Sequence, residues 1–445
     1  MTTAPSPSGT DSCDLAVVGA GAAGLFAAIS AGRTARAAGA PLRIVALDGA
    51  RTLGAKILVA GGGRCNVTHH RVDETAYAGS SRNAIRNVLR RFTVDDTVRF
   101  FRERGVELKR EPTGKLFPTT DRARTILDAL LAAARDAGVE IRHPWRVESI
   151  ARADHGFTIT SITGDQLTAR RIILATGGRS LPRTGSDGHG YTLARALGHS
   201  LTPRIFPALV PLTLPEGHFL CSLSGITIEA TLDLRSGTGK KLVAFTNSTL
   251  LTHFGLSGPA VLDISRYYLD AAAHARQTGA PPPRLLINFL PSHTTESLDA
   301  ALQNLRSRSA ARLLSDPPYN LPDRLARALC EHAGIDPSAP GGGHTLTRER
   351  RRALATAATA LELPITGDRG FAHAEVTAGG VPLAEVHLDT MESRITPGLH
   401  LCGEILDVDG RIGGFNFQWA WASGFTAGTG AARALAAASD AAPRP

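Results

Sequence analysis

The sequence lacks the residue patterns of a disulfide framework, a metal finger or a membrane anchor. Its five cysteines, at 13, 65, 221, 330 and 402, form no CxxC pair, which argues against a redox dithiol and favours a reducing compartment. No apolar run approaches the roughly 18–20 residues that span a bilayer. The first residues, MTTAPSPSGTDS, lack the basic and apolar segments of a signal peptide. We therefore expect a cytoplasmic protein without a metal site.

Lysine is also scarce, because only five of the 49 basic residues are lysines. Arginine therefore carries almost all of the formal net charge of +9, and a basic excess can indicate nucleic acid or an anionic membrane as a partner. The arginines are scattered, with short clusters at 86–91 and 347–352 that suit solvated helix faces. We expect a small-molecule substrate and neither nucleic acid nor a membrane as partner, and the sequence does not specify the oligomeric state.

The N-terminal part of the chain has the pattern of a βαβ unit. Residues 14–19 read as a short apolar strand and residues 25–40 as a helix with a small-residue face, followed by a second strand at 43–48. Similar composition returns near the C-terminus. The economical interpretation is one α/β domain, formed by residues 13–198 and 371–435, that is interrupted by an insertion.

The insertion, residues 199–370, differs in composition from its flanks. Prolines become frequent after about residue 200, short alternating strands follow, and a polar helical region covers about 260–360. The termini, residues 1–12 and 436–445, are expected to be flexible.

A glycine turn in the βαβ unit has the spacing of a dinucleotide-binding motif. GAGAAG (19–24) follows a strand and opens a helix, which is the context that supports a GxGxxG match. Gly19 permits the tight turn, Gly21 lets the backbone approach a pyrophosphate, and Gly24 allows close helix–sheet packing. The N–H groups at the start of the helix would face the phosphates.

Two further features narrow the choice of cofactor to FAD. Asp48 ends the second strand, where an acid would accept hydrogen bonds from the adenosine ribose; it favours an unphosphorylated ribose, and so FAD or NAD over NADP. The stretch GAKILVAGGGRCNVT (54–68) then reads as a second glycine loop, with Lys56 and Arg64 near the pyrophosphate and flavin. An NAD domain has no need of such a loop.

Three later stretches could complete an FAD site. ILATGG (173–178) is a strand that ends in small residues, and TGSDGHGYTLARALG (184–198) is a glycine turn that opens a helix. Near the C-terminus GLHLCGEILDVDG (398–410) leads into a glycine pair and a helix with a narrow ridge of small residues. We expect this ridge to lie close to a large planar group, and the helix dipole to favour the anionic reduced flavin. Trp419 and Trp421 are expected to pack against the insertion, with substrate stacking as the alternative.

Taken together, these motifs resemble those of BaiN/YhiN-type flavoproteins, the aminoacetone-oxidase-family FAD-binding enzymes. The shared stretches run in order from residue 14 to about 430, and GGGRCN and GGFNFQWAWASG are the most specific. The resemblance implies an α/β fold with a Rossmann-like FAD domain in two segments, interrupted by a β-barrel-like region and a helical subdomain. It also implies noncovalent FAD and oxidoreductase activity. One departure is Ala55, where the family usually has a second lysine beside Lys56.

The motifs and the resemblance together predict a set of residues that contact FAD. They are Gly19, Gly21, Ala22, Ala23, Gly24, Asp48, Lys56, Gly61, Gly62, Gly63, Arg64, Asn66, Val147, Thr176, Gly177, Gly403, Glu404, Asp407, Gly414 and Asn416.

No motif specifies a general acid or base. His253, in the insertion that should cap the flavin, and Tyr191, in the second glycine turn, are the catalytic candidates. No second GxGxxG follows a strand, so NAD(P)H would have to meet the flavin directly if it is the electron donor.

The sequence therefore favours an FAD-dependent oxidoreductase that transfers hydride at flavin N5 to or from a small amine or enone. An RNA-modifying flavoprotein, motivated by the net charge, and a flavin-binding redox sensor without turnover are the alternatives.

Overall fold

The computed structural model describes residues 11–305, 308–339 and 346–440. Its contacts divide the chain into two compact units. The first unit combines Met1–Pro207 with Glu375–Pro445, and the second is Ala208–Ala374. Each unit has its own cluster of buried apolar side chains, as expected of separate domains.

A seven-stranded sheet forms the centre of the first unit. Its order is β7-β2-β1-β10-β9-β8, and β20 also pairs with β10. The pairs β7–β2, β2–β1, β1–β10 and β10–β20 are parallel, whereas β8 and β9 are antiparallel. These strands are β1 (Ser12–Val18), β2 (Ile44–Leu47), β7 (Val139–Arg142), β8 (Val147–Ala153), β9 (Gly156–Ser161), β10 (Gln166–Leu174) and β20 (Leu399–Leu401). The central parts of this parallel sheet are continuously apolar and buried, at IVAL in β2, LAVV in β1 and IIL in β10, because both faces of such a sheet are covered.

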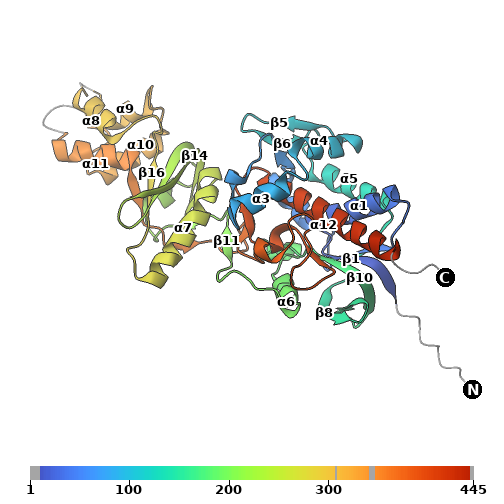
Figure 1. Ribbon diagram of the computed structural model, residues 1–445. Helices are drawn as coiled ribbons and strands as arrows, with labels where there is room; N and C mark the ends of the chain where they lie inside the picture. The colour runs from blue at the N-terminus through green and yellow to red at the C-terminus, as the bar shows by residue number, and fades with distance from the viewer. Residues whose placement is uncertain (1–10, 306–307, 340–345, 441–445) are drawn as a thin grey trace, which may run out of the picture. The chain divides into compact units, whose positions relative to one another are not determined.

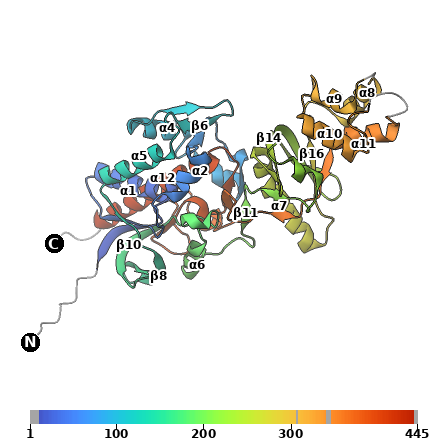
Figure 2. The same ribbon diagram turned by 180° about the vertical axis from the view of Figure 1, so that it is seen from behind.

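Helices α1 (Ala22–Ala37) and α12 (Phe415–Asp440) run side by side along this sheet, although they come from opposite ends of the chain (Figure 1). The view from behind shows the same pairing (Figure 2). Both helices are rich in alanine and glycine, so their backbones can approach closely. The remaining helices of the unit are α2 (Ala55–Gly63), α3 (Arg82–Leu89), α4 (Val94–Glu103), α5 (Ala123–Asp136) and α6 (His189–Ala196).

Short strands in the first unit position its loops. They are β3 (Thr68–His69), β4 (Tyr77–Gly79), β5 (Leu108–Arg110), β6 (Lys115–Pro118), β11 (Phe206–Ala208), whose last residue lies in the second unit, β19 (Val376–Ala378) and β21 (Val408–Gly410). The pairing of β4 with β21 ties the segment before the C-terminal glycine pair to residues near 78.

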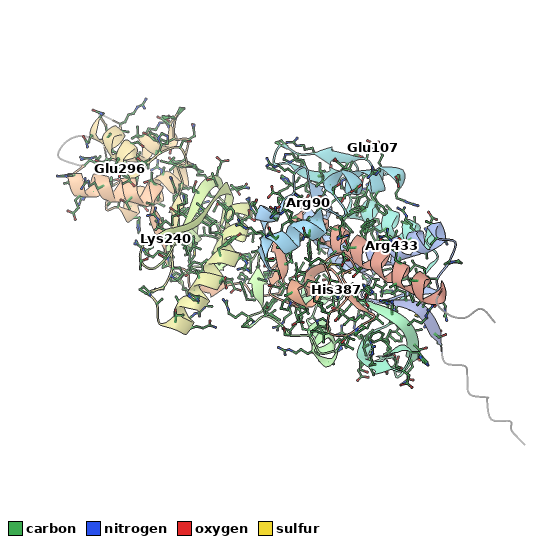
Figure 3. The ribbon with its side chains drawn as sticks, viewed as in Figure 1. Arg90, Glu107, Lys240, Glu296, His387 and Arg433 are labelled. Atoms are coloured by element: carbon green, nitrogen blue, oxygen red, sulfur yellow. The ribbon has the colours of Figure 1, made fainter. Side chains whose placement is uncertain are left out.

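The second unit contains an antiparallel sheet of seven strands and a group of helices. The sheet order is β17-β16-β13-β14-β15-β12-β18. Its strands are β12 (Leu212–Thr213), β13 (Thr227–Arg235), β14 (Lys241–Thr252), β15 (Gly255–Ser257), β16 (Arg284–Asn288), β17 (Leu361–Leu363) and β18 (Gly367–Asp368). The helices are α7 (Pro259–Thr278), α8 (Thr295–Gln303), α9 (Ala310–Ser315), α10 (Asp323–His332) and α11 (Arg348–Thr359). Figure 3 shows Lys240 in the turn before β14 and Glu296 in α8.

Two sequence expectations about local structure differ from the structure. Residues 54–68 were expected to be a loop, but α2 covers Ala55–Gly63, with non-helical backbone at Ala60, Gly61 and Gly62. The last residues were expected to be flexible from 436, but α12 continues to Asp440. Alanine, which has the highest helix propensity, explains this extension. Residues 1–10 and 441–445 lie outside the described ranges. Within those ranges, no helix has the length and apolar character that crossing a membrane requires.

Candidate cofactor and active site

The glycine turn after β1 leaves open space where a pyrophosphate would approach. A Cβ on Gly19, whose φ is +99°, would lie 2.5 Å from the Ala175 carbonyl oxygen, and one on Gly24 would lie 1.8 Å from the Gly19 oxygen. In contrast, a Cβ on Gly21 would meet no atom within 4 Å. The first-turn N–H groups of α1 have no partner within the helix. The turn is therefore tightly packed at Gly19 and Gly24, whereas the space next to Gly21 contains no protein atoms.

Asp48 is fixed beside this turn at the carboxyl end of β2. Its Oδ2 accepts a hydrogen bond from the Ala20 N–H (2.8 Å), and its Oδ1 accepts one from the Ala50 N–H (2.8 Å). Each carboxylate oxygen keeps a second lone pair, so Asp48 could still accept a ribose hydroxyl. Val147 is buried at the start of β8.

The glycine run at the end of α2 is exposed, and its backbone is left-handed. Gly61, Gly62 and Gly63 have φ values of +58°, +68° and +84°. Cβ atoms added to Gly62 and Gly63 would meet nothing closer than 3.9 Å. Asn66 follows this run, and its buried Oδ1 has no hydrogen-bond partner among the described residues. In the same part of the chain, the buried Oγ1 of Thr176, after β10, also lacks a partner.

Four motif segments meet at the carboxylate of Glu404. Its Oε2 accepts a hydrogen bond from Lys56 Nζ at 2.5 Å, and its Oε1 accepts from Ser180 Oγ (2.9 Å) and the Thr377 N–H (2.9 Å). Lys56 also donates to Ser180 Oγ at 2.6 Å. Gly178 must be glycine here, because its Cβ would lie 2.5 Å from Thr377 Oγ1. The carboxylate thus joins α2, the turn after β10, β19 and the segment after β20.

Some predicted cofactor residues have protein partners in the structure. The Arg64 guanidinium donates to Glu111 Oε1 (2.6 Å) and lies over the Phe117 ring. Asn416 exchanges hydrogen bonds with the backbone of Gly410. Asp407 accepts a hydrogen bond through its backbone oxygen from the Ser80 N–H. These contacts shape the loops that surround the site.

The small-residue ridge of α12 packs against α1. Cβ atoms on Gly424 and Gly428 would lie 2.6 Å from the Ala23 oxygen and 2.1 Å from the Ala27 oxygen. Close helix packing thus accounts for Gly424, which the sequence analysis placed on the ridge that faces a planar ligand, and for Gly428 one turn later. At the start of α12, a Cβ on Gly414 would lie 2.5 Å from the Thr68 carbonyl carbon.

The two tryptophans lie in the core of the first unit, contrary to expectation. Trp419 Nε1 donates to the Gly403 carbonyl (3.1 Å), and Trp421 Nε1 donates to the Val67 carbonyl (2.9 Å). Trp421 also contacts Phe101 and Phe417. Both side chains are almost completely buried. They hold the start of α12 against the loops that carry the glycine motifs.

The geometry of the motif residues themselves fits FAD. Gly21, Gly62 and Gly63 present open backbone, and Asn66 and Thr176 keep unused buried polar atoms. An unpaired buried acceptor such as Asn66 Oδ1 costs about 1–3 kcal/mol, and the N–H of a bound isoalloxazine would satisfy it. Within the described ranges, no group of three His, Cys, Asp or Glu side chains is placed to hold a metal ion.

Comparison with known proteins identifies the family. The model of the HI0933-like protein Rossmann domain matches residues 13–430. The chain belongs to the HI0933-like family. A 3-dehydro-bile acid delta(4,6)-reductase of Clostridium scindens is 34% identical over 422 residues, which cover 94% of this chain and 98% of that protein. A ribosomal RNA dihydrouridine synthase of Escherichia coli is 34% identical over 412 residues, covering 92% and 96%.

A solved structure supports the fold of this HI0933-like chain. A 3-ketosteroid delta1-dehydrogenase from Sterolibacterium denitrificans matches with a TM-score of 0.50 and 13% identity, over 96% of this chain and 100% of that one. At that identity the likeness shows the fold alone. The family assignment makes the chain an FAD-dependent oxidoreductase, as the sequence motifs predict.

The two catalytic candidates of the HI0933-like chain lie in different units. Tyr191 is buried in α6 of the first unit, with its hydroxyl 3.5 Å from the Gly379 carbonyl oxygen. Burial, reinforced by the charge of Glu404, raises the pKa of this hydroxyl. His253 is exposed in the turn between β14 and β15 of the second unit. A catalytic role for either residue remains a prediction.

Sequence reasoning missed Ser180 and Thr377, which hold Glu404. Both lie in stretches on which the family resemblance rests, ATGGRS and AEVTAGGV. The signal was therefore present as a motif, but the spacing does not reveal that the Ser180 hydroxyl and the Thr377 backbone N–H donate to the same carboxylate.

Proposed function

We propose that the enzyme reduces a carbon–carbon double bond that is conjugated to a carbonyl group. The supporting observation is the similarity over more than 90% of the chain to two relatives whose names share this chemistry. A delta(4,6)-reductase of a 3-dehydro bile acid saturates such bonds, and dihydrouridine is uridine with its C5=C6 bond saturated. Amine oxidation has no counterpart in these names, so we favour the enone over the amine.

The residues of the first unit would hold and orient FAD. The first-turn N–H groups of α1 would bind the pyrophosphate that Gly21 admits, and Asp48 would accept a ribose hydroxyl. Asn66 would accept a hydrogen bond from the isoalloxazine ring. Bound FAD would supply hydride transfer at its N5 atom.

A proton must reach the carbon next to the one that receives hydride. Tyr191 is a candidate donor, because a tyrosine hydroxyl is protonated at neutral pH. Its burial raises the pKa further and makes the hydroxyl a weaker acid. His253 is the second candidate, since an imidazolium could donate the same proton.

Anaerobic mixing of the purified FAD-loaded protein with NADH and NADPH would test the electron donor by loss of flavin absorbance. Conjugated enones, amines and a uridine-containing RNA are then added to the reduced protein. We expect an enone to restore the absorbance and to be converted to the saturated ketone. Reoxidation by none of these compounds would contradict the proposal, and a single stoichiometric cycle would favour the redox sensor.

A uridine in RNA is the second candidate substrate. The net charge of +9 and the two relatives named ribosomal RNA dihydrouridine synthase favour it. Its discriminator is dihydrouridine formation in RNA together with binding that weakens steeply as salt increases.

A further inference from the structure

Among the described residues, the side chain of Arg369 in the second unit has ordered contacts but no carboxylate partner. Seven of the thirteen arginines that the structure describes in this unit form an ion pair with a carboxylate, which compensates their charge. Those pairs involve Arg235, Arg266, Arg284, Arg308, Arg312, Arg327 and Arg351. Across the described residues, the recorded partners of the Arg369 side chain are one aromatic ring and one imidazole.

The contacts of Arg369 fix the orientation of its guanidinium. Its Cζ lies 4.3 Å from the centre of the Phe254 ring, a distance that is typical of a cation–π contact. One terminal nitrogen lies 3.2 Å from His373 Nε2. Because arginine has only donors, the guanidinium donates and the imidazole nitrogen accepts. His253 packs edge-on against the same Phe254 ring, with the centroids 5.1 Å apart.

Strand pairing explains why residues so far apart in sequence meet here. β12 lies between β15 and β18, and Thr213 pairs with both Gly255 and Gly367. The Leu214 N–H donates to the Phe254 carbonyl, and the Arg369 N–H donates to the Pro211 carbonyl. The cluster therefore stands on backbone that is fixed by the sheet.

The charge balance of the cluster favours an anion. Neither ring contact neutralises Arg369, so its full charge and its remaining N–H donors stay available. The nearest acid in sequence, Asp368, uses Oδ1 to accept the Gly370 N–H at 2.6 Å. A guanidinium that is already oriented loses little side-chain entropy when it binds an oxyanion, and it can do so through two hydrogen bonds.

We propose that Arg369, with Phe254, His373 and His253 around it, forms an anion-binding site of the second unit for a ligand that carries a phosphate or carboxylate group. A carboxylate would come from a small organic acid and a phosphate from an RNA backbone.

Calorimetric titration of inorganic phosphate and of acetate into the FAD-loaded protein tests the site without turnover. We expect Arg369→Gln to weaken the binding of these anions by about tenfold or more, as for loss of a charge-assisted hydrogen bond. Arg276→Gln, which removes the same charge from an exposed position on α7, should change it by less than about twofold. Equal binding by the wild type and Arg369→Gln, or no binding by the wild type, would overturn the site.

Two further arms identify the source of the anion and guard against misfolding. A carboxylate-bearing enone, its uncharged analogue and a uridine oligonucleotide are titrated separately to identify the source of the anion. Arg369→Gln should weaken the binding of the charged ligand and leave the binding of the uncharged analogue unchanged. Arg369→Lys keeps the charge but not the planar fork, so it should retain part of the phosphate affinity. If Arg369→Gln fails to fold, Arg369→Lys and Phe254→Leu carry the test, and full phosphate affinity in both would overturn the site.

Discussion

Glycines in two regions of the first unit have opposite surroundings. In the seam between α1 and α12, a Cβ on Gly424 or Gly428 would run into the backbone of α1, at 2.6 Å and 2.1 Å from carbonyl oxygens. At the cofactor site, a Cβ on Gly21 or Gly62 would meet no atom within 4 Å. The same residue type thus serves helix packing in the seam and ligand approach at the site.

The seam glycines therefore contribute to the stability of the fold, whereas the glycines at the cofactor site contribute to FAD binding. In the seam glycine lets two helices from opposite ends of the chain approach closely, and this contact holds the glycine-bearing loops together. At the cofactor site glycine leaves room that the protein itself does not fill. A substitution in the seam should therefore impair folding, whereas one at the site should impair FAD binding in a protein that still folds.

The largest effect is expected for Gly428→Val in the seam. Its side chain would meet the backbone of α1, which cannot move without shifting the sheet, so we expect a loss of about 3 kcal/mol or more. The measurement is the soluble yield and the unfolding temperature. Arg433→Val is the control, because Arg433 is exposed on the same helix (Figure 3) and should change stability by less than about 0.5 kcal/mol. A well-folded Gly428→Val protein would contradict the comparison.

Gly21 gives the complementary test at the open site. Its φ is −77°, so alanine fits the backbone, and the unfolding temperature of the FAD-free Gly21→Ala protein should equal that of the wild type. The added methyl group should weaken FAD binding by about tenfold, or about 1.4 kcal/mol. Gly21→Glu should abolish binding, because its carboxylate would face the pyrophosphate. The measurement is flavin absorbance per polypeptide, and wild-type flavin content in Gly21→Glu would refute the site.

The sequence predicts the parts of this architecture that depend on local pattern. The helix expected at 25–40 is α1 (Ala22–Ala37), and the strand expected at 43–48 is β2 (Ile44–Leu47). These elements follow from apolar runs punctuated by glycine, which act over a few residues. The helical turns before Gly61 were missed, because a glycine-rich stretch conceals a short helix.

The rest depends on contacts between distant parts of the chain. Lys56 was predicted to lie near the phosphates, but its contacts with Glu404 and Ser180 span 348 and 124 positions of sequence. The packing partner of the small-residue ridge of α12 could not be predicted either, because small residues allow both a ligand and a helix to approach closely. Such contacts follow from tertiary packing, which no local pattern encodes.

The last effect that we predict concerns protons in the packed part of the first unit. His400 in β20 is fully buried beside the Thr390 loop that packs against Gly430 of α12. Its Nδ1 lies 2.9 Å from the Thr390 carbonyl oxygen, and its Nε2 lies 3.2 Å from a guanidinium nitrogen of Arg171. Since Arg171 can only donate, Nε2 must accept, and the neutral imidazole is the form that fits.

Burial lowers the pKa of His400 from 6.5 to about 4, against the opposing charge of Glu392. The unfolded chain takes up the proton first, so this contribution to stability is complete above pH 6.5 and is lost as the pH falls towards 4. The loss is at most about 3 kcal/mol. His400→Gln should flatten the pH dependence of the unfolding free energy between pH 6.5 and about 5, above the range where Glu392, whose pKa is also lowered, takes up its proton. If the pH dependence of the unfolding free energy were the same in this variant, protonation of His400 would not destabilise the packed region. The packed region and the open cofactor site would then differ only in the space around their glycines.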